Sequence, residues 1–120
     1  MYSAAKKIDN IIVTVDLNGK QIDGATDEVL PLGDVAKKFS AFGWEVILLK
    51  EGNNIEKIIE KLSLARMLAN KANPIVILMK TEMGKGVDFM MHTHAWHGKA
   101  PNDEQLDLAL SQNPETLGDY

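Results

Sequence analysis

The sequence predicts a single α/β domain, residues 1–120, in which helices pack on a parallel sheet of at least three strands. Three short apolar segments predict the strands, at Ile11–Val15, Val46–Leu49 and Ile75–Met79. They are apolar at nearly every position instead of alternating, which indicates strands covered on both faces, as in a parallel sheet. Their starts lie about 30 residues apart, close to the length of one βαβ unit.

The composition limits the functional classes. Of 120 residues, 45% are apolar and 25% charged, which is ordinary for a globular domain and excludes a disordered or fibrous chain. The absence of Cys excludes disulfides, thiolate metal sites and a cysteine nucleophile. A net charge of −4 argues against nucleic acid as the main partner. No apolar run approaches the ~20 residues of a membrane helix, and no secretory signal precedes the first strand. The expected location is the cytoplasm, with no membrane partner.

Helices are predicted before and between the strands. Tyr2–Ile8 resembles the end of a helix that leads into the first strand. Asp34–Phe42 has apolar residues at helical spacing, with Asp34 as N-cap and Gly43 as the residue that ends the helix.

The remaining helices lie farther along the chain. Ile55–Ala69 carries an apolar stripe, and Asn53 with Glu56 resembles a capping box. Asp103–Ser111 predicts a short final helix, and residues 112–120 are expected to be loose.

Two long polar segments, Asp16–Leu32 and Thr81–Asp103, follow the carboxyl ends of the first and third predicted strands. Open α/β sheets bind ligands at that edge. In the first segment, the Asn18 amide oxygen and the carbonyl oxygen of Lys20 are ligands of the type that Mg²⁺ prefers. The alternative interpretation is an Asn-Gly turn followed by an Asp-Gly turn, which is the commoner origin of this spacing.

The second segment holds all three histidines, His92, His94 and His97. Three such residues within six positions form a candidate zinc site, although no carboxylate accompanies them. A single histidine would instead hydrogen-bond a phosphate or a sugar hydroxyl, and the commonest interpretation is an exposed loop. Gly84-Lys85-Gly86 allows a phosphate contact or a flexible loop, because it lacks the Walker A spacing.

Taken in order, six motifs are more specific than any one of them. The motifs are Asp9–Val13, Asp16–Gly24, Glu28–Asp34, Ala41–Val46, Lys80–Val87 and Ala95–Asp103. Together they extend over about residues 1–110 and resemble the transketolase family, most of all the N-terminal, thiamine diphosphate-binding subunit of split bacterial and archaeal transketolases.

This resemblance implies a thiamine diphosphate and Mg²⁺ enzyme that moves a two-carbon ketol unit between sugar phosphates. It implies that Asn18 binds the metal through its side chain and Lys20 through its backbone carbonyl. Ile22 matches a position near the thiazolium ring of the cofactor. His97 matches a catalytic histidine that contacts the cofactor diphosphate and the substrate. His92 and His94 receive no role.

The sequence departs from the family pattern in two places. The Gly-Asp-Gly half of the metal motif, expected upstream of Met1, is absent, and so is the glutamate that activates the cofactor. A missing upstream half and a pyrimidine-binding subunit or domain are therefore the expected partners. The isolated chain is expected to be inactive, to bind neither thiamine diphosphate nor Mg²⁺, and to form a homo-oligomer. The alternative function is that of a small non-enzymatic α/β module that binds a phosphate ligand or a protein partner.

Overall fold

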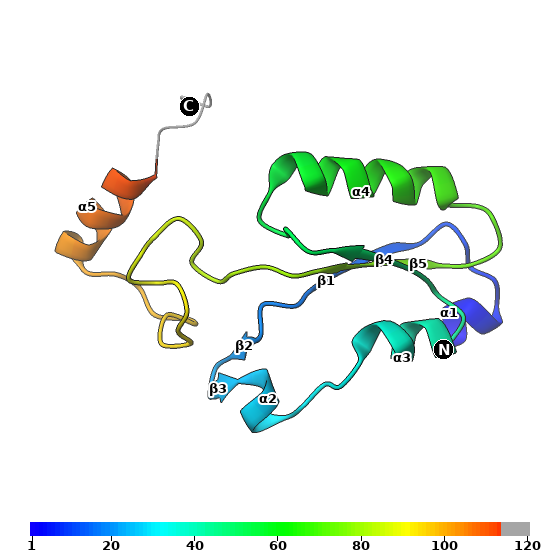
Figure 1. Ribbon diagram of the computed structural model, residues 1–120, viewed down its shortest axis with the longest axis horizontal. Coiled ribbons are helices and arrows are strands. Elements are labelled where there is room, and N and C mark those ends of the chain that lie inside the picture. Colours follow the sequence, from blue (N-terminus) through cyan, green and yellow to red (C-terminus); the bar gives the residue numbers. More distant parts are fainter. Residues whose placement is uncertain (114–120) are drawn as a thin grey trace.

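Three parallel strands form the centre of the structure, in the order β1-β5-β4 (Figure 1). They are β1 (Ile12–Asp16), β4 (Glu45–Leu49) and β5 (Ile75–Met79). The structure is a computed structural model that describes residues 1–113. The expected α/β fold with a parallel sheet of at least three strands is confirmed, and the strand bounds agree with the sequence prediction to within one residue.

The central strand, β5, accounts for most of the core. Ile75, Val76 and Ile77 are at most 1% exposed, because β5 pairs with β1 on one side and with β4 on the other and both of its faces are covered. A continuous apolar run is what such a strand requires. The edge strands are less buried, and Thr14 and Asp16 of β1 are exposed.

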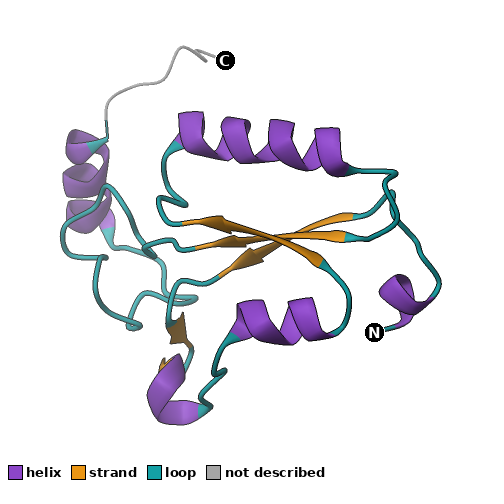
Figure 2. Ribbon diagram, turned by 45° about the vertical axis from the view of Figure 1, so that its right-hand side comes forward, coloured by secondary structure: helices purple, strands orange, loops and turns teal. Residues whose placement is uncertain are grey.

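Helix α4 (Ile55–Leu68) covers one face of the sheet and α3 (Val35–Ala41) lies on the other, so the domain has three layers (Figures 1 and 2). Side chains from the strands and α4 form the buried cluster on the α4 face. Its members are Ile47, Leu49, Ala65, Ile75 and Ile77.

The starts of both helices are capped by side chains. Asp34 accepts a hydrogen bond from the Lys37 backbone N–H, as predicted, and this bond lowers the pKa of the Asp34 carboxyl. For α4 the predicted cap is wrong by one residue. Asn54 accepts from the Lys57 N–H at 3.0 Å, whereas Asn53 bonds to the backbone of the segment that follows β5. Asn54 is the residue directly before the first helical turn, where the cap must lie.

The two flanks of α4 differ in chemistry. Lys57, Glu60 and Lys61 face the β4 edge and are linked by ion pairs of 3.1 and 2.9 Å. These pairs lower the pKa of the Glu60 carboxyl, with the Lys61 hydrogen bond as the main cause. The helix flank beside the β4 edge is therefore charged.

The opposite flank of α4, toward β1, is apolar and exposed. Ile55 and Ile59 are 60% and 57% exposed, and Leu62 is exposed as well. Their spacing places them on one side of the helix. Only part of the predicted apolar stripe therefore packs on the sheet, because β1 lies beyond the reach of α4. Thr14 of β1 lies on the sheet face that α4 covers elsewhere, and it is exposed.

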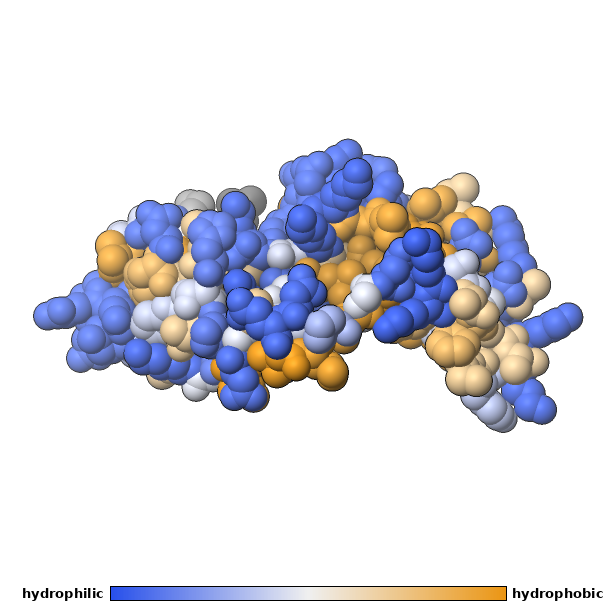
Figure 3. Space-filling view, turned by 60° about the horizontal axis from the view of Figure 1, so that its bottom comes forward, coloured by the Kyte–Doolittle hydropathy of each residue, from blue (hydrophilic) through white to orange (hydrophobic). Residues whose placement is uncertain are grey.

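The face of the sheet opposite α4 is also only partly covered. Leu48 on this face is 56% exposed, because α3 is seven residues long and extends over part of the sheet. Figure 3 views the molecule from the α3 side and shows apolar surface open to solvent near its middle. Large apolar side chains are therefore exposed on both sides of the sheet, Leu48 on this side and Ile55 and Ile59 on the other.

Short elements occupy both ends of the sheet. Helix α1 (Tyr2–Ala5), the predicted helix end, lies near the amino ends of the strands (Figure 1). After β1 the chain forms a small hairpin, β2 (Lys20–Gln21) with β3 (Gly24–Ala25), followed by α2 (Thr26–Val29).

Helix α5 (Asp103–Gln112) confirms the predicted final helix and begins with a capping box formed by Asn102 and Gln105. It lies beyond the carboxyl ends of the strands (Figure 1). It bonds to the preceding loop through the Asp88 N–H and Gln112. The segment predicted as loose, residues 112–120, begins at the last turn of α5, and 114–120 lie outside the described residues. No helix among residues 1–113 is long and apolar enough to cross a membrane.

We expect Asn54→Ala to lower the free energy of unfolding by about 1 kcal/mol, because the first turn of α4 loses its side-chain acceptor. Urea denaturation measures the change. Asn54→Ser should restore most of the stability, and Asn10→Ala, at an exposed position ahead of β1, should leave it within about 0.5 kcal/mol. Equal midpoints for Asn54→Ala and the parent chain would show that the cap is not formed.

Candidate functional site

The carboxyl ends of the three strands bring the predicted functional segments to one edge of the sheet. The Leu17 N–H donates to the Met79 carbonyl at 2.8 Å, so the chain after β1 stays beside β5. The Gly52 N–H donates to the Lys80 carbonyl at 2.8 Å and links the chains that follow β4 and β5. The two polar segments therefore begin at a shared edge, where ligands bind in open α/β sheets.

Asn18 lies in a tight turn directly after β1. Its side-chain Oδ1 accepts a hydrogen bond of 2.8 Å from the Lys20 backbone N–H, and Gly19 between them has a φ of 71°. The Gly19 carbonyl in turn accepts from the Thr26 N–H at 3.0 Å. The Asn-Gly turn considered from the sequence is therefore present. It leaves Oδ1 with a second lone pair for another partner.

Asp16 is also a member of this cluster. It begins the candidate segment, but the sequence assigned it no role. Its Oδ2 accepts from the Asn18 side-chain Nδ2 at 3.2 Å, and its Oδ1 accepts from the Thr81 hydroxyl. The available signal was position, since Asp16 is the last residue of β1 and stands two residues before Asn18. Its link to Thr81 depends on the pairing of β1 with β5, which sequence alone does not reveal.

The predicted metal ligands line a hollow of about 210 Å³. An amide oxygen and a backbone carbonyl are donors that Mg²⁺ accepts, but two neutral oxygens do not complete a site for a cation that favours octahedral, anionic coordination. Within residues 1–113, no three His, Asp or Glu side chains come together to hold a metal ion. The donor type fits Mg²⁺, and the described residues hold too few donors. The hollow is lined by Asp16–Lys20, Thr26, Asp27, Leu32, Gly33 and Val35.

Ile22 lies at the tip of the hairpin, between the paired residues Gln21 and Gly24. Its side chain is 69% exposed. An apolar side chain at a hairpin tip gains nothing from exposure to water. The position leaves Ile22 free to contact a ligand or another chain, and its assignment to the cofactor remains a prediction.

His97 lies in the second polar segment, and its side chain is exposed. The His97 N–H donates to the His94 carbonyl at 3.0 Å, and within residues 1–113 the imidazole itself makes no hydrogen bond or ion pair. Since His92 and His94 are also exposed and no metal-binding group forms in the described part of the chain, the zinc interpretation has no geometric support.

The loop that carries His97 is held by an aromatic contact. The Trp96 indole N–H donates to the Phe89 carbonyl at 2.8 Å, and the two rings meet edge to face with centroids 5.1 Å apart. Lys99 lies over the Trp96 ring, its Nζ 4.9 Å from the ring centre. The residue next to His97 is therefore the anchor of the loop.

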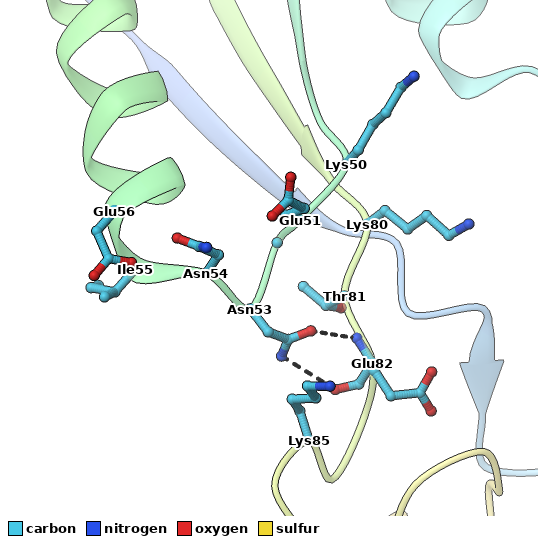
Figure 4. A pocket seen from close by; sticks show the side chains of 11 residues that line it. Lys50, Glu51, Asn53, Asn54, Ile55, Glu56, Lys80, Thr81, Glu82 and Lys85 are labelled. Carbon is cyan, nitrogen blue, oxygen red and sulfur yellow. Dashed lines mark hydrogen bonds between the residues drawn. The ribbon is translucent and has the colours of Figure 1, made fainter.

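Glu82 ties the same loop to the sheet. Its carboxylate accepts from the His92 backbone N–H at 2.7 Å and lies 3.4 Å from the His92 Nδ1. The Glu82 backbone is paired with the Asn53 side chain through bonds of 2.7 and 3.3 Å (Figure 4). His92, which the sequence left without a role, contributes to this local structure.

A larger cavity, of about 580 Å³, lies where β4 and β5 end and α4 begins (Figure 4). Its lining includes three lysines and three glutamates, whose charges cancel, and Lys50 and Lys80 project outward in Figure 4. Lys85 belongs to the Gly84-Lys85-Gly86 motif. Gly84 and Gly86 have positive φ angles, of 70° and 102°. The backbone conformation of the loop therefore accounts for glycine at both positions. The cavity adjoins the Asn18 hollow through the bond between Thr81 and Asp16.

Sequence comparison identifies the family. Residues 1–114 match the family model described as transketolase, thiamine diphosphate binding domain. The chain is 32% identical over 111 residues to an apulose-4-phosphate transketolase subunit of Phocaeicola vulgatus, a match that covers 92% of this chain and 38% of that protein. It is also 32% identical over 112 residues to a 6-deoxy-6-sulfo-D-fructose transketolase subunit of Clostridium sp., over 93% of this chain and 40% of that protein.

Structural comparison agrees. A transketolase crystal structure from Campylobacter jejuni superposes with a TM-score of 0.80 at 28% identity, over 92% of this chain and 17% of that one. The chain thus spans about two fifths of the length of the subunit relatives. Because the family model matches residues 1–114 and the fold is shared, the chain belongs to the transketolase family, within its thiamine diphosphate-binding domain.

Proposed function

We propose that this chain supplies part of the Mg²⁺ and thiamine diphosphate site of a transketolase assembly and is inactive alone. The observation that carries the proposal is the turn after β1, in a chain of this family. There the Asn18 Oδ1 and the Lys20 carbonyl lie two residues apart at the ligand-binding edge of the sheet. These two oxygens would hold one side of the metal ion, which bridges protein oxygens to a diphosphate.

Thiamine diphosphate supplies the carbon nucleophile for transfer of a two-carbon unit. The chain's own residues bind and orient. His97 would donate a hydrogen bond to the cofactor diphosphate and to the substrate, and its exposed imidazole, which makes no hydrogen bond within residues 1–113, is consistent with that role. Ile22, exposed at the hairpin tip, would pack near the thiazolium ring. The substrates we propose are sugar phosphates, in keeping with the name of the Phocaeicola vulgatus relative.

A companion polypeptide must complete this site, because Mg²⁺ requires further anionic oxygens. We place the contact at the free edge of β1, beside the apolar α4 flank of Ile55, Ile59 and Leu62. A parallel strand added there would end next to Asn18, since parallel strands share their carboxyl edge. The β4 edge is less suitable because charged residues guard it.

The source of the companion is indicated by the relatives. The chain matches 38% and 40% of two transketolase subunits, so more than half of such a subunit is available to supply the missing strand and acidic ligands. The Phocaeicola vulgatus relative is named as one subunit of its transketolase, which points to a second subunit for the pyrimidine-binding half. Without these partners, we propose that a second copy pairs with the β1 edge.

A chimera tests the metal assignment. This chain would replace the matching 111 residues of the Phocaeicola vulgatus relative, expressed with the companion subunit of that enzyme. We expect Asn18→Ala to raise the Mg²⁺ concentration needed for thiamine diphosphate binding, measured by calorimetry, with partial rescue by excess metal. Lys20→Ala is the matched control and should change little, because the backbone carbonyl remains. An unchanged Mg²⁺ requirement in Asn18→Ala would remove Asn18 from the site.

His97→Ala in the same chimera should lower kcat/KM ten- to a hundred-fold, since the loss of one hydrogen bond to a charged group costs about 1.5–3 kcal/mol. The readout is the transketolase assay. His92→Ala and His94→Ala should be nearly silent. Their hydrogen bonds in the loop use backbone groups, and the one side-chain contact, between the His92 imidazole and Glu82, is exposed. If either is as damaging as His97→Ala, the assignment of His97 to the diphosphate loses its support.

The isolated chain should self-associate and should bind no thiamine diphosphate at micromolar concentration. Light scattering measures the first property and calorimetry the second. Ile59→Lys should shift the chain toward monomer, because it places a charge on the exposed flank beside β1. Leu64→Lys is the matched control, since Leu64 is also exposed on α4 but lies away from that flank. A monomeric parent chain that binds the cofactor tightly would refute the proposed incompleteness.

A further inference from the structure

The Asn18 side chain is bonded at both ends of its amide. Its Oδ1 accepts from the Lys20 N–H at 2.8 Å, and its Nδ2 donates to Asp16 Oδ2 at 3.2 Å. An amide is nearly symmetric in shape but not in hydrogen-bonding chemistry, since its oxygen only accepts and its nitrogen only donates. These two partners therefore require the same orientation of the side chain.

A flipped amide would be opposed at both ends. Its NH₂ would face the Lys20 N–H, donor against donor, and its oxygen would face the Asp16 carboxylate, acceptor against acceptor. The flip would lose two hydrogen bonds and create two repulsions. The Lys20 bond is the shorter and more buried of the two. The longer, exposed bond to Asp16 adds a second constraint in the same sense, and its acceptor is charged.

Asp16 is itself held in place. Its second oxygen, Oδ1, accepts from the Thr81 hydroxyl, which follows β5. Asp16 is paired with Met79 in the β1–β5 register, so the bond to Thr81 joins the ends of two neighbouring strands. Through the Asp16 carboxylate, the Asn18 amide is therefore hydrogen-bonded to the segment that follows the central strand.

We infer that Asp16 is a positioning residue that fixes the Asn18 amide with its oxygen directed away from the carboxylate, and that Thr81 anchors Asp16 for this purpose. The inference deepens the proposed function, on which its link to Mg²⁺ rests, while the orientation itself is a property of this chain. A metal ligand must present oxygen, because an amide NH₂ cannot bind Mg²⁺. The bonded pair Asp16 and Thr81, here called the clamp, excludes the flipped orientation of the Asn18 amide before a metal ion binds.

Nuclear magnetic resonance on the isolated chain tests the orientation without metal or cofactor. The Lys20 amide should exchange its hydrogen slowly, and Asn18→Ala defines the unprotected level. We expect Asp16→Ala to lower the protection of the Lys20 amide about three- to ten-fold, as for loss of an ordinary hydrogen bond. The Asn18 side-chain NH₂ resonances should move toward their positions in an unstructured peptide.

Three controls separate positioning from general damage. The Leu17 amide, bonded to the Met79 carbonyl, should keep its protection in Asp16→Ala. Asp23→Ala removes an exposed carboxylate from the same loop and should leave the Lys20 amide unchanged. Thr81→Val should weaken the protection, whereas Thr81→Ser, which keeps the hydroxyl, should restore it.

The outcomes distinguish this inference from the proposed function. Full Lys20 protection in Asp16→Ala, with protection lost in Asn18→Ala, would overturn the positioning role. In the chimera, Asp16→Ala should raise the Mg²⁺ requirement less than Asn18→Ala does. A larger effect of Asp16→Ala would make Asp16 a metal ligand and also overturn the inference. If the exchange results hold and neither variant changes the Mg²⁺ requirement, the clamp stands and the metal assignment fails.

Discussion

The parallel pairing of β5 with both β1 and β4 is the interaction on which the structure depends. It buries Ile75, Val76 and Ile77 almost completely and satisfies the backbone of the central strand on both sides. It also places three carboxyl ends along one edge. The Asn18 turn, the Asn53–Glu82 pair and the cavity at the start of α4 all lie at that edge, and each is held by bonds between chains that leave neighbouring strands.

Helix α4 covers the three strands of the sheet unequally. A helix that packs over β4 and β5 cannot also cover β1, so one flank of α4 and one strand edge are left with apolar or unpaired groups. The β4 side carries the Lys57–Glu60–Lys61 ion pairs instead. In exposed positions such pairs add little stability, but they make strand addition unfavourable. The two edge strands, β1 and β4, therefore lie beside helix flanks of different chemistry.

The candidate site residues lie in two separate segments of the chain. The described residues around Asn18 offer neutral oxygens and two carboxylates, Asp16 and Asp27, of which Asp16 is already bonded to Asn18 and Thr81. His97 is in a different segment, fixed by the Trp96–Phe89 contact and by Glu82. Each part is ordered by its own hydrogen bonds. Under the proposed function, these two parts would be one side of a metal and cofactor site, to which a companion chain adds anionic oxygens.

Much of this protein was determined by local sequence. The continuous apolar runs identified three buried parallel strands because strands covered on both faces have no polar side. Asp34 and Gly43 set the bounds of α3, and six short motifs in the right order indicated the transketolase family. Each of these signals depends on residues close together in the chain.

Tertiary structure decided the rest. The order β1-β5-β4 made Asp16 a neighbour of Thr81, a contact between residues 65 positions apart. It gave the Asn53 side chain a partner in the backbone of Glu82, while Asn54, directly before the first turn, caps α4. It also left Ile55 and Ile59 exposed in a stripe that periodicity marks as buried. Helical periodicity reports which residues share a side of a helix, but only the assembled sheet determines which of those residues have something to pack against.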